Sequence, residues 1–342
     1  MVKVLFVGDS TSPQYVRAFY NTAKELKDVD ASLFKSEDFW NSTSLFIKIE
    51  KHYKKGIVLN KLNNDLYKQC QKEKYDLVFF YGSSLIYAKT VKKIKSLGSA
   101  IFIYCNDNPF SKWYKPYVWK NLRESLKYCD RAYAYRESDI EQYKKYGAQQ
   151  AGLLKSYYMA ERNYYIPDEK IDLYVPDVVY IGHYEKDGRE DYIRALLDDD
   201  IKVGLNHSWE GFETDNQNVV RFDRKISMEH YNEILNKAKI AIVFLSSINK
   251  DSYTRRCYEI PAVKTLMVSQ YTDTIAEMYK EDEEIIFFRN KEEFLSKIHY
   301  YSDHPDEAQI IAQKGYDRLV TSKNEVSDRV KQVLNDYIRD KK

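Results

Sequence analysis

The chain has 342 residues, of which 44% are hydrophobic and 31% are charged. This composition is typical of a globular protein and excludes disordered, collagen-like and membrane-spanning chains. The 54 basic and 52 acidic residues leave a net charge of +2, which gives no global electrostatic reason to bind nucleic acid. A single hydrophobic core rarely grows beyond about 300 residues, so we expect two domains.

The first half of the chain alternates between strand and helix patterns. Short apolar runs of strand length are followed by segments in which apolar residues recur every three or four positions. Strands are predicted at 2–8, 31–35, 75–82, 100–106, 131–136 and 152–156, and helices at 14–27, 60–73, 86–97, 113–127 and 138–146. Continuous apolar strands that alternate with helices predict a parallel sheet covered on both faces.

Residues 161–177 contain two of the seven prolines and neither period, which predicts a linker. A second alternation follows the linker. Strands are predicted at 177–183, 201–206, 219–222, 240–246, 265–270 and 284–289, and helices at 187–198, 228–238, 273–280, 291–303, 306–320 and 325–340. We expect doubly wound α/β domains at 1–165 and 166–325 that face a cleft, with a C-terminal helix, 326–342, that packs back on the first.

Other features limit the class of protein. The four cysteines form no C-x-x-C pair, so we expect buried, reduced thiols rather than disulfides or a structural metal. The apolar run in "MVKVLFVGDS" is too short for a signal peptide, so we predict a cytoplasmic location. The acidic run 198–200 falls at the sheet edge opposite the expected ligand, and no metal ion is predicted.

Polar residues follow two predicted strands of the first half. Gly8 and Ser10 come after the first strand, where a glycine lets the backbone approach a ligand; a plain tight turn is the alternative. Asp107 follows the fourth strand in "CNDNPF" and could take a proton from a sugar hydroxyl, or belong to an Asx turn. Beyond it, 110–120 interleaves aromatic residues with lysines, which suits sugar stacking, contact with a membrane surface, or ordinary partial burial.

The second half repeats the strand, turn and helix order in "YIGHYEKDGRE". Gly182 and His183 close a strand, and Arg189 begins the next helix, where its guanidinium could meet a diphosphate. A lone histidine is also commonly a structural group, and that alternative stays open for His183.

The segment "DSYTRRCYEIPA", 251–262, concentrates polar residues on a short helix between two apolar strands. Ser252 and Thr254 are N-cap candidates that would leave backbone amides for an anion. Arg256 could add a bidentate phosphate contact, and Glu259, three residues on, could accept hydrogen bonds from both hydroxyls of a ribose. An internal Arg256–Glu259 salt bridge is the alternative.

The pattern S-x-T-x-R-x-(aromatic)-E-I-P-A, formed by residues 252–262, resembles the donor-site helix of CgeB-like (spore maturation protein type) glycosyltransferases. These are related to the group 1 retaining glycosyltransferases. The resemblance extends over about 177–330, through "VVYIGHYEKDGRE" and the residues after the helix, and more loosely to "NDNP". Ser252 stands where related enzymes carry an acidic residue, and Lys264 where the family often has a glycine.

The resemblance implies a GT-B fold, with an acceptor-binding first domain and a second domain that binds the nucleotide-sugar. It implies metal-independent, retaining transfer, in which fixed amides and cations stabilise the leaving diphosphate. Asp107 and His183 are the expected catalytic residues. The expected donor-binding residues are Gly8, Ser10, Gly182, Arg189, Ser252, Tyr253, Thr254, Arg256 and Glu259.

The function expected from this resemblance is transfer of a sugar, from a UDP-sugar rather than a GDP-sugar, to a polysaccharide, glycoprotein or glycolipid. No cofactor, metal or nucleic acid is expected, and contact with the inner face of a membrane stays open. One alternative is a nucleotide-sugar epimerase. The other is a non-catalytic GT-B-fold partner in a glycosylation complex, which stays open because the acidic residue expected at Ser252 is missing.

Overall fold

The computed structural model describes residues 1–40, 44–206, 209, 211–212, 214–223 and 226–341. The chain forms two compact units, Met1–Lys155 with Val326–Lys342, and Ser156–Glu325. Residues 156–165, expected in the first domain, belong to the second unit because their contacts lie there. The Ser156 N–H donates to the Tyr253 hydroxyl at 3.2 Å, and the Tyr158 N–H donates to the Asn324 carbonyl at 3.1 Å.

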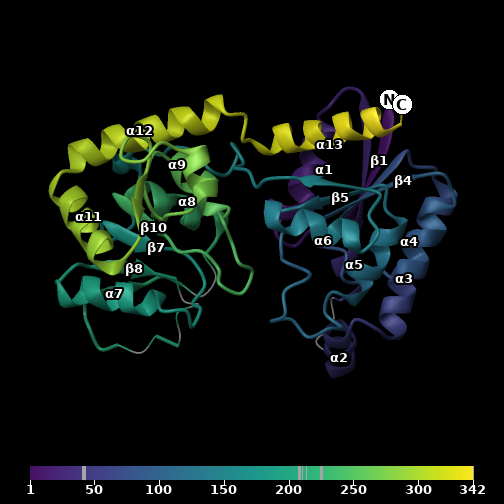
Figure 1. Ribbon diagram of the computed structural model, residues 1–342, viewed down its shortest axis with the longest axis horizontal. Helices are drawn as coiled ribbons and strands as arrows, with labels where there is room; N and C mark the ends of the chain where they lie inside the picture. The colour runs from purple at the N-terminus through teal and green to yellow at the C-terminus, as the bar shows by residue number, and fades with distance from the viewer. Residues whose placement is uncertain (41–43, 207–208, 210, 213, 224–225, 342) are drawn as a thin grey trace. The chain divides into compact units, whose positions relative to one another are not determined.

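The first unit is built on a six-stranded parallel sheet in the order β2-β1-β3-β4-β5-β6. Its strands are β1 (Val2–Gly8), β2 (Val29–Lys35), β3 (Leu77–Tyr81), β4 (Ala100–Cys105), β5 (Arg131–Ala134) and β6 (Gln150–Leu153). Its helices are α1 (Ala18–Lys24), α2 (Leu45–Tyr53), α3 (Ile57–Lys72), α4 (Ala88–Lys95), α5 (Lys120–Ser125), α6 (Ile140–Lys145) and α13 (Val326–Asp340). Figure 1 shows helices flanking the sheet, as the βα alternation predicts.

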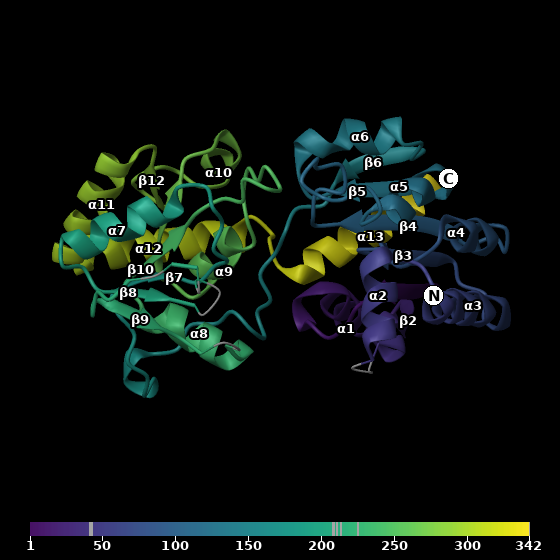
Figure 2. The same ribbon diagram turned by 90° about the horizontal axis from the view of Figure 1, so that it is seen from below.

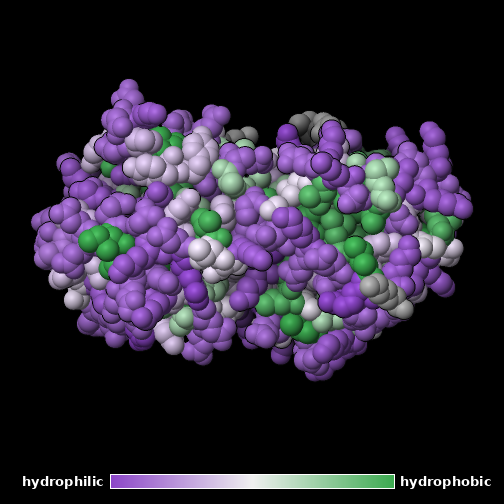
Figure 3. Space-filling model, turned by 90° about the horizontal axis from the view of Figure 1, so that it is seen from above, coloured by the Kyte–Doolittle hydropathy of each residue, from purple (hydrophilic) through white to green (hydrophobic). Residues whose placement is uncertain are grey.

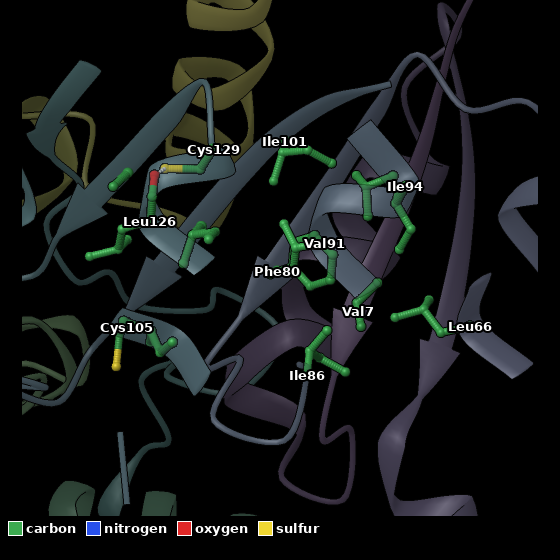
Figure 4. Packing of buried hydrophobic residues seen from close by; sticks show 14 of the residues in the cluster. Val7, Leu66, Phe80, Ile86, Val91, Ile94, Ile101, Cys105, Leu126 and Cys129 are labelled. Atoms are coloured by element: carbon green, nitrogen blue, oxygen red, sulfur yellow. Dashed lines mark hydrogen bonds between the residues drawn. The ribbon is translucent and has the colours of Figure 1, made fainter. Parts of the chain in front are cut away.

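The core of the first unit lies between the sheet and its helices. Figure 4 shows side chains of strands, such as Val7, Phe80 and Ile101, meeting Val91 and Ile94 of α4. The four cysteines of the chain are buried and free, as expected. Burial raises the pKa of three of these thiols to about 12, those of Cys70, Cys129 and Cys257, so they are unreactive at neutral pH.

The second unit repeats the design with a six-stranded parallel sheet in the order β12-β11-β10-β7-β8-β9. Its strands are β7 (Val178–Tyr180), β8 (Val203–Leu205), β9 (Val219–Arg221), β10 (Ile240–Val243), β11 (Leu266–Gln270) and β12 (Ile286–Phe288). Its helices are α7 (Arg189–Asp198), α8 (Met228–Lys237), α9 (Arg256–Ala262), α10 (Asp273–Met278), α11 (Lys291–Asp303) and α12 (Pro305–Thr321). Three of these helices begin at side-chain caps, Ser227, Thr272 and Asn290, each of which accepts a backbone N–H.

The last helix, α13, packs in the first unit, where Figure 1 shows it in yellow beside α1. It buries Val326, Val330, Val333 and Tyr337 at helical spacing. Polar bonds to the sheet accompany this stripe, since Arg131 of β5 makes two 2.7 Å hydrogen bonds to the Asp340 carboxylate. Helix α13 therefore completes the first unit although it is last in sequence.

The face shown in Figure 3 is mainly hydrophilic, with hydrophobic residues in separate patches. Within the described part of the chain, no helix is both long enough and apolar enough to cross a membrane.

Candidate functional site

The second sheet reverses its direction of growth between β7 and β10. From β7 the chain adds β8 and β9 on one side, whereas β10, β11 and β12 lie on the other. Open α/β sheets bind ligands outside the carboxyl ends of the strands at such a switch point. Here those ends are followed by residues 181–183 and 244–245, and the polar side chains that gather there form the candidate site.

Arg189 is buried at this point and uses all of its donors within the protein. Its Nε and Nη2 bind the Asp187 carboxylate at 2.7 and 2.5 Å, and Nη1 donates to the Tyr180 hydroxyl at 2.9 Å. The remaining N–H groups donate to the carbonyls of His183 at 2.8 Å and Leu245 at 3.1 Å. Burial alone would lower the pKa of Arg189, but Asp187, Tyr180 and Glu185 raise it. Arg189 therefore holds together the loop after β7 and the loop after β10. All of its N–H groups are used in these contacts, so its guanidinium serves the loops rather than a ligand.

The Arg256 guanidinium also lies at the switch point, but it makes few and long hydrogen bonds. Its Nη1 and Nη2 make long 3.4 Å bonds to the carbonyls of Ile181 and Phe244, and its buried Nε has no partner among the described residues. The guanidinium carbon lies 5.5 Å from the centre of the Tyr180 ring. Burial opposes the charge, but Tyr180, Tyr231 and Glu259 raise the pKa of Arg256 above its ordinary value. The Arg256 guanidinium is thus positively charged, only weakly bound by the protein, and able to donate further hydrogen bonds.

Gly182 lies against the Tyr180 hydroxyl and the Arg256 guanidinium. A Cβ added at this position would come within 2.5 Å of the Tyr180 hydroxyl and 3.0 Å of Arg256 Nη1. The glycine is therefore required by close packing, which the sequence motif could suggest but not explain.

We expect Gly182→Ala to push the Tyr180 hydroxyl off the Arg189 guanidinium and to displace Arg256. Overpacking of this kind costs about 1–3 kcal/mol of stability. Urea unfolding of the variant measures that loss. Gly204→Ala is a matched comparison in the same unit, because its added Cβ would meet the Phe222 ring at 2.8 Å and Val179 at 3.0 Å, and neither arginine is among its nearest contacts. Both variants should lose stability, and only Gly182→Ala should also weaken UDP binding.

Glu259 is buried on α9, and one of its carboxylate oxygens accepts a 2.7 Å hydrogen bond from the Tyr231 hydroxyl of α8. Burial and the Glu259 charge raise the pKa of Tyr231 well above its usual value, so this phenol remains a donor. No ion pair within 4 Å joins Arg256 to Glu259 in the described part of the chain. The salt bridge that the sequence left open is therefore not formed, and one Glu259 oxygen keeps its capacity to accept.

The residues before α9 have mainly structural contacts. The Thr254 hydroxyl accepts the Arg256 N–H at 3.1 Å, and the Ser252 carbonyl accepts from the Thr272 hydroxyl at 2.6 Å. Tyr253 is 1% exposed, and its hydroxyl accepts the Ser156 N–H. Arg255, rather than Ser252 or Thr254, occupies the N-cap position, and its side chain makes no capping hydrogen bond.

His183 has an exposed imidazole after β7, and only its backbone carbonyl takes part in the Arg189 contacts. Sequence reasoning missed Tyr180 and Tyr231, which orient the two arginines and Glu259. Tyr180 is a strand residue that looks like ordinary core, and Tyr231 lies on another helix, so neither carried a motif.

The residues predicted in the first unit lie at the carboxyl edge of its sheet. Gly8 sits at that sheet's switch point, where an added Cβ would come within 2.9 Å of the Tyr81 carbonyl. Ser10 is buried, and its N–H and hydroxyl both bind the Glu37 carboxylate, so its polar atoms serve a turn. Asp107 is half-buried after β4, and the next residue makes the Asx turn, with Asn108 Oδ1 accepting the Phe110 N–H at 3.0 Å.

The described residues include no group of three or more histidines, cysteines or acids that could hold a metal ion. In the acidic run 198–200, Asp199 binds the His299 ring at 2.8 Å.

Part of the sequence matches a known protein family. Residues 189–335 match the family model described as "Glycosyl transferase-like", a span that starts at Arg189 and contains Arg256 and Glu259. No curated protein matches the sequence significantly.

Solved structures match the whole chain. Sucrose-phosphate synthase from Thermosynechococcus elongatus is 11% identical with a TM-score of 0.73, and 99% of each chain is covered. A glycosyltransferase from Rickettsia africae is 14% identical with a TM-score of 0.69, covering 100% of this chain and 99% of that one. Anabaena HepE, solved in complex with UDP-glucose, is 11% identical with a TM-score of 0.66, covering 98% and 99%.

At such identities these matches establish the fold, which is GT-B with two Rossmann-like domains, as the family resemblance implied. The family match places a glycosyl transferase-like sequence over the candidate site of the second unit. The matched family and the fold together indicate a glycosyltransferase.

Proposed function

We propose that this protein transfers a sugar from a UDP-sugar to a saccharide, glycoprotein or glycolipid acceptor, as a CgeB-like enzyme. The observation that carries the proposal is a pair of side chains on α9, at the switch point of the second sheet. One is the half-buried Arg256, whose guanidinium makes only two long hydrogen bonds to described residues, and the other is the buried Glu259 carboxylate, which has one oxygen free to accept. Structural neighbours solved with UDP and UDP-glucose support the choice of donor.

Arg256 takes the diphosphate in this proposal. Its guanidinium is held by weak carbonyl contacts and lies under Gly182, where no side chain intervenes. A phosphate would supply short, charge-assisted bonds in place of the 3.4 Å contacts. The cation would then stabilise the negative charge that grows on the leaving diphosphate as the sugar departs, which is electrostatic preorganisation.

Glu259 takes the ribose. Tyr231 fixes the carboxylate by one oxygen, and a ribose diol can donate to the other. Arg189 acts as a positioning residue, because it holds the loops after β7 and β10 that carry Gly182 and the carbonyls facing Arg256. Gly182 completes this donor site, and Ser252, Tyr253 and Thr254 support α9.

The acceptor, retention of configuration and independence of metal ions remain parts of the proposal. Asp107 and His183 are its candidate catalytic groups, with Gly8 and Ser10 shaping the edge of the first sheet. Asp107 would take the acceptor proton, and His183 would contact the transferred sugar. Release of UDP together with a glycosylated acceptor would distinguish transfer from epimerisation, which releases no nucleotide, and from a non-catalytic role.

We expect UDP to raise the melting temperature of the protein, and Glu259→Ala to reduce that shift. Loss of hydrogen bonds to a charged acceptor costs about 1.5–3 kcal/mol, which weakens UDP binding about 10- to 150-fold. Thermal shift against UDP concentration measures the change, because a ligand that binds only the folded state stabilises it by mass action.

Glu50→Ala is the matched control for this experiment. Glu50 is 4% exposed and Glu259 is 5% exposed, but Glu50 accepts the backbone N–H groups of Ile57 and Val58 in the first unit. The control should lower the melting temperature and keep the UDP-induced shift. Equal UDP affinity in Glu259→Ala and the wild type would remove the ribose role.

A further inference from the structure

Helix α2 exposes the stripe that a helix of a globular protein normally buries. Leu45, Phe46, Ile49 and Tyr53 follow helical spacing on one side and are 72%, 54%, 47% and 49% exposed. Glu50, one turn after Phe46 and at the border of this stripe, is buried, and its carboxylate accepts three N–H groups at the start of α3. Glu50 thus fixes the helix to the unit, while the apolar side chains beside it remain exposed.

The loop within 110–120 extends this apolar surface. The Tyr117 hydroxyl lies 2.7 Å from His52 Nε2, and the Tyr117 ring lies 5.5 Å from the Tyr53 ring, so the loop is docked on the last turn of α2. Trp113 in this loop and Ile57 after α2 are each 72% exposed. We call these six apolar side chains the α2 surface: Leu45, Phe46, Ile49, Tyr53, Ile57 and Trp113.

The charge around the α2 surface is one-sided, although the whole chain is nearly neutral. Residues 44–57 and 110–120 contain one acid, the buried Glu50, and seven lysines, which are Lys48, Lys51, Lys54, Lys55, Lys112, Lys115 and Lys120. Of these lysines only Lys120 forms an ion pair with a described residue, Glu124. The surface therefore presents apolar and aromatic groups among unneutralised cations.

The α2 surface occupies one end of the first unit. Figures 1 and 2 show α2 at the end away from the two chain termini, standing in front of the sheet when the protein is seen from below. Strand β1 begins at the terminus, so this end holds the carboxyl edge of the sheet. A cavity of about 670 Å³, lined in part by Phe46, Lys55 and Ile57, adjoins the surface.

We infer that the α2 surface docks on a bilayer that contains anionic lipids, with α2 lying in the plane of the headgroups. Interfacial helices bury Leu, Phe and Trp among the upper acyl chains and direct lysines to anionic headgroups. Tyr and Trp prefer this zone because their rings are apolar and their tips are polar. A nucleic acid would use the lysines and leave the apolar stripe in water, whereas an anionic bilayer accommodates both features.

Co-sedimentation of the full-length protein with vesicles tests the inference. We expect binding to phosphatidylcholine vesicles that contain phosphatidylglycerol, weaker binding to phosphatidylcholine alone, and release by salt, which screens the lysines. Each lysine near an anionic surface contributes about 1 kcal/mol, so Lys48→Gln with Lys51→Gln should weaken binding about 25-fold. Phe46→Ser with Ile49→Ser should weaken it at least about tenfold through lost apolar burial.

The matched control is Ile310→Ser with Lys291→Gln in the second unit, where Ile310 is 56% exposed, close to the value for Phe46. This variant should bind vesicles like the wild type. All substituted side chains are exposed, and unchanged melting temperatures would verify folding. Absence of wild-type binding to the anionic vesicles, or equal binding by the α2 variants, would overturn the inference.

Discussion

Replacement of Arg256 by alanine is expected to lower kcat/KM for a UDP-sugar by about two to three orders of magnitude. The size follows from losses seen when one preorganised donor to a developing oxyanion is removed. The reason is local, because Arg256 is a half-buried cation whose two guanidinium hydrogen bonds are 3.4 Å long and whose Nε is unpaired among the described residues. Turnover of UDP-glucose, measured by UDP release, follows the loss.

Two further variants make this result specific. Arg256→Lys keeps a charge but loses the planar fork, so its activity should lie between those of the wild type and the alanine variant. Arg255→Ala removes the neighbouring guanidinium, which lies 4.8 Å from the Tyr157 ring, and should retain activity within a few-fold. A loss in Arg256→Ala no larger than that in Arg255→Ala would contradict the diphosphate role.

The two parallel sheets could be predicted because their central strands are buried on both faces. Runs such as "VKVLFVG" and "IAIVFLS" contain no period-two alternation, and the structure places their strands at Val2–Gly8 and Ile240–Val243. Helix α2 was not predicted, although Leu45, Phe46, Ile49 and Tyr53 recur at helical spacing, and that spacing alone could not show that the stripe is exposed rather than packed on the core. The helix predicted at 113–127 shortens to Lys120–Ser125, since Pro116 prevents a continuous helix before it.

The candidate site was predictable only where residues close in sequence act together. Arg256 and Glu259 share one helix, so their spacing was informative. The role of Arg189 depends on its hydrogen bonds to the Tyr180 hydroxyl and the Leu245 carbonyl. Leu245 is 56 positions along the chain, and no local sequence pattern predicts a contact over that separation. For the same reason Tyr231, which is 28 positions from Glu259, could not be assigned.

Lys264 shows how a departure from a family pattern can be accommodated. Lys264, two positions after the last residue of α9, has a φ of 61°, in the left-handed region that favours glycine at a helix end. Lysine adopts this strained conformation here, and its ammonium lies 5.1 Å from the Tyr165 ring and 4.8 Å from the Tyr316 ring. Cation–π contacts of this kind offset part of the backbone cost.

Arg189→Ala is expected to destabilise the second unit by about 3–5 kcal/mol, the usual cost of removing one partner from a buried ion pair. The Arg189 side chain is 3% exposed, and its loss would leave the Asp187 carboxylate and the carbonyls of His183 and Leu245 without their donor. The loops after β7 and β10 would then separate. Urea unfolding followed by probes of each unit measures the loss, because two units need not unfold together.

Arg289→Ala provides the matched control, because Arg289 also binds a carboxylate through two nitrogens, at 2.6 and 2.8 Å from Glu281. Its side chain is 43% exposed, so solvent screens the pair and the expected cost is about 0.2–1 kcal/mol. The two arginines thus differ in burial and in the carbonyls that only Arg189 binds. A similar small cost for both variants would show that Arg189 does not hold the loops, and Arg189 would then become available for the diphosphate.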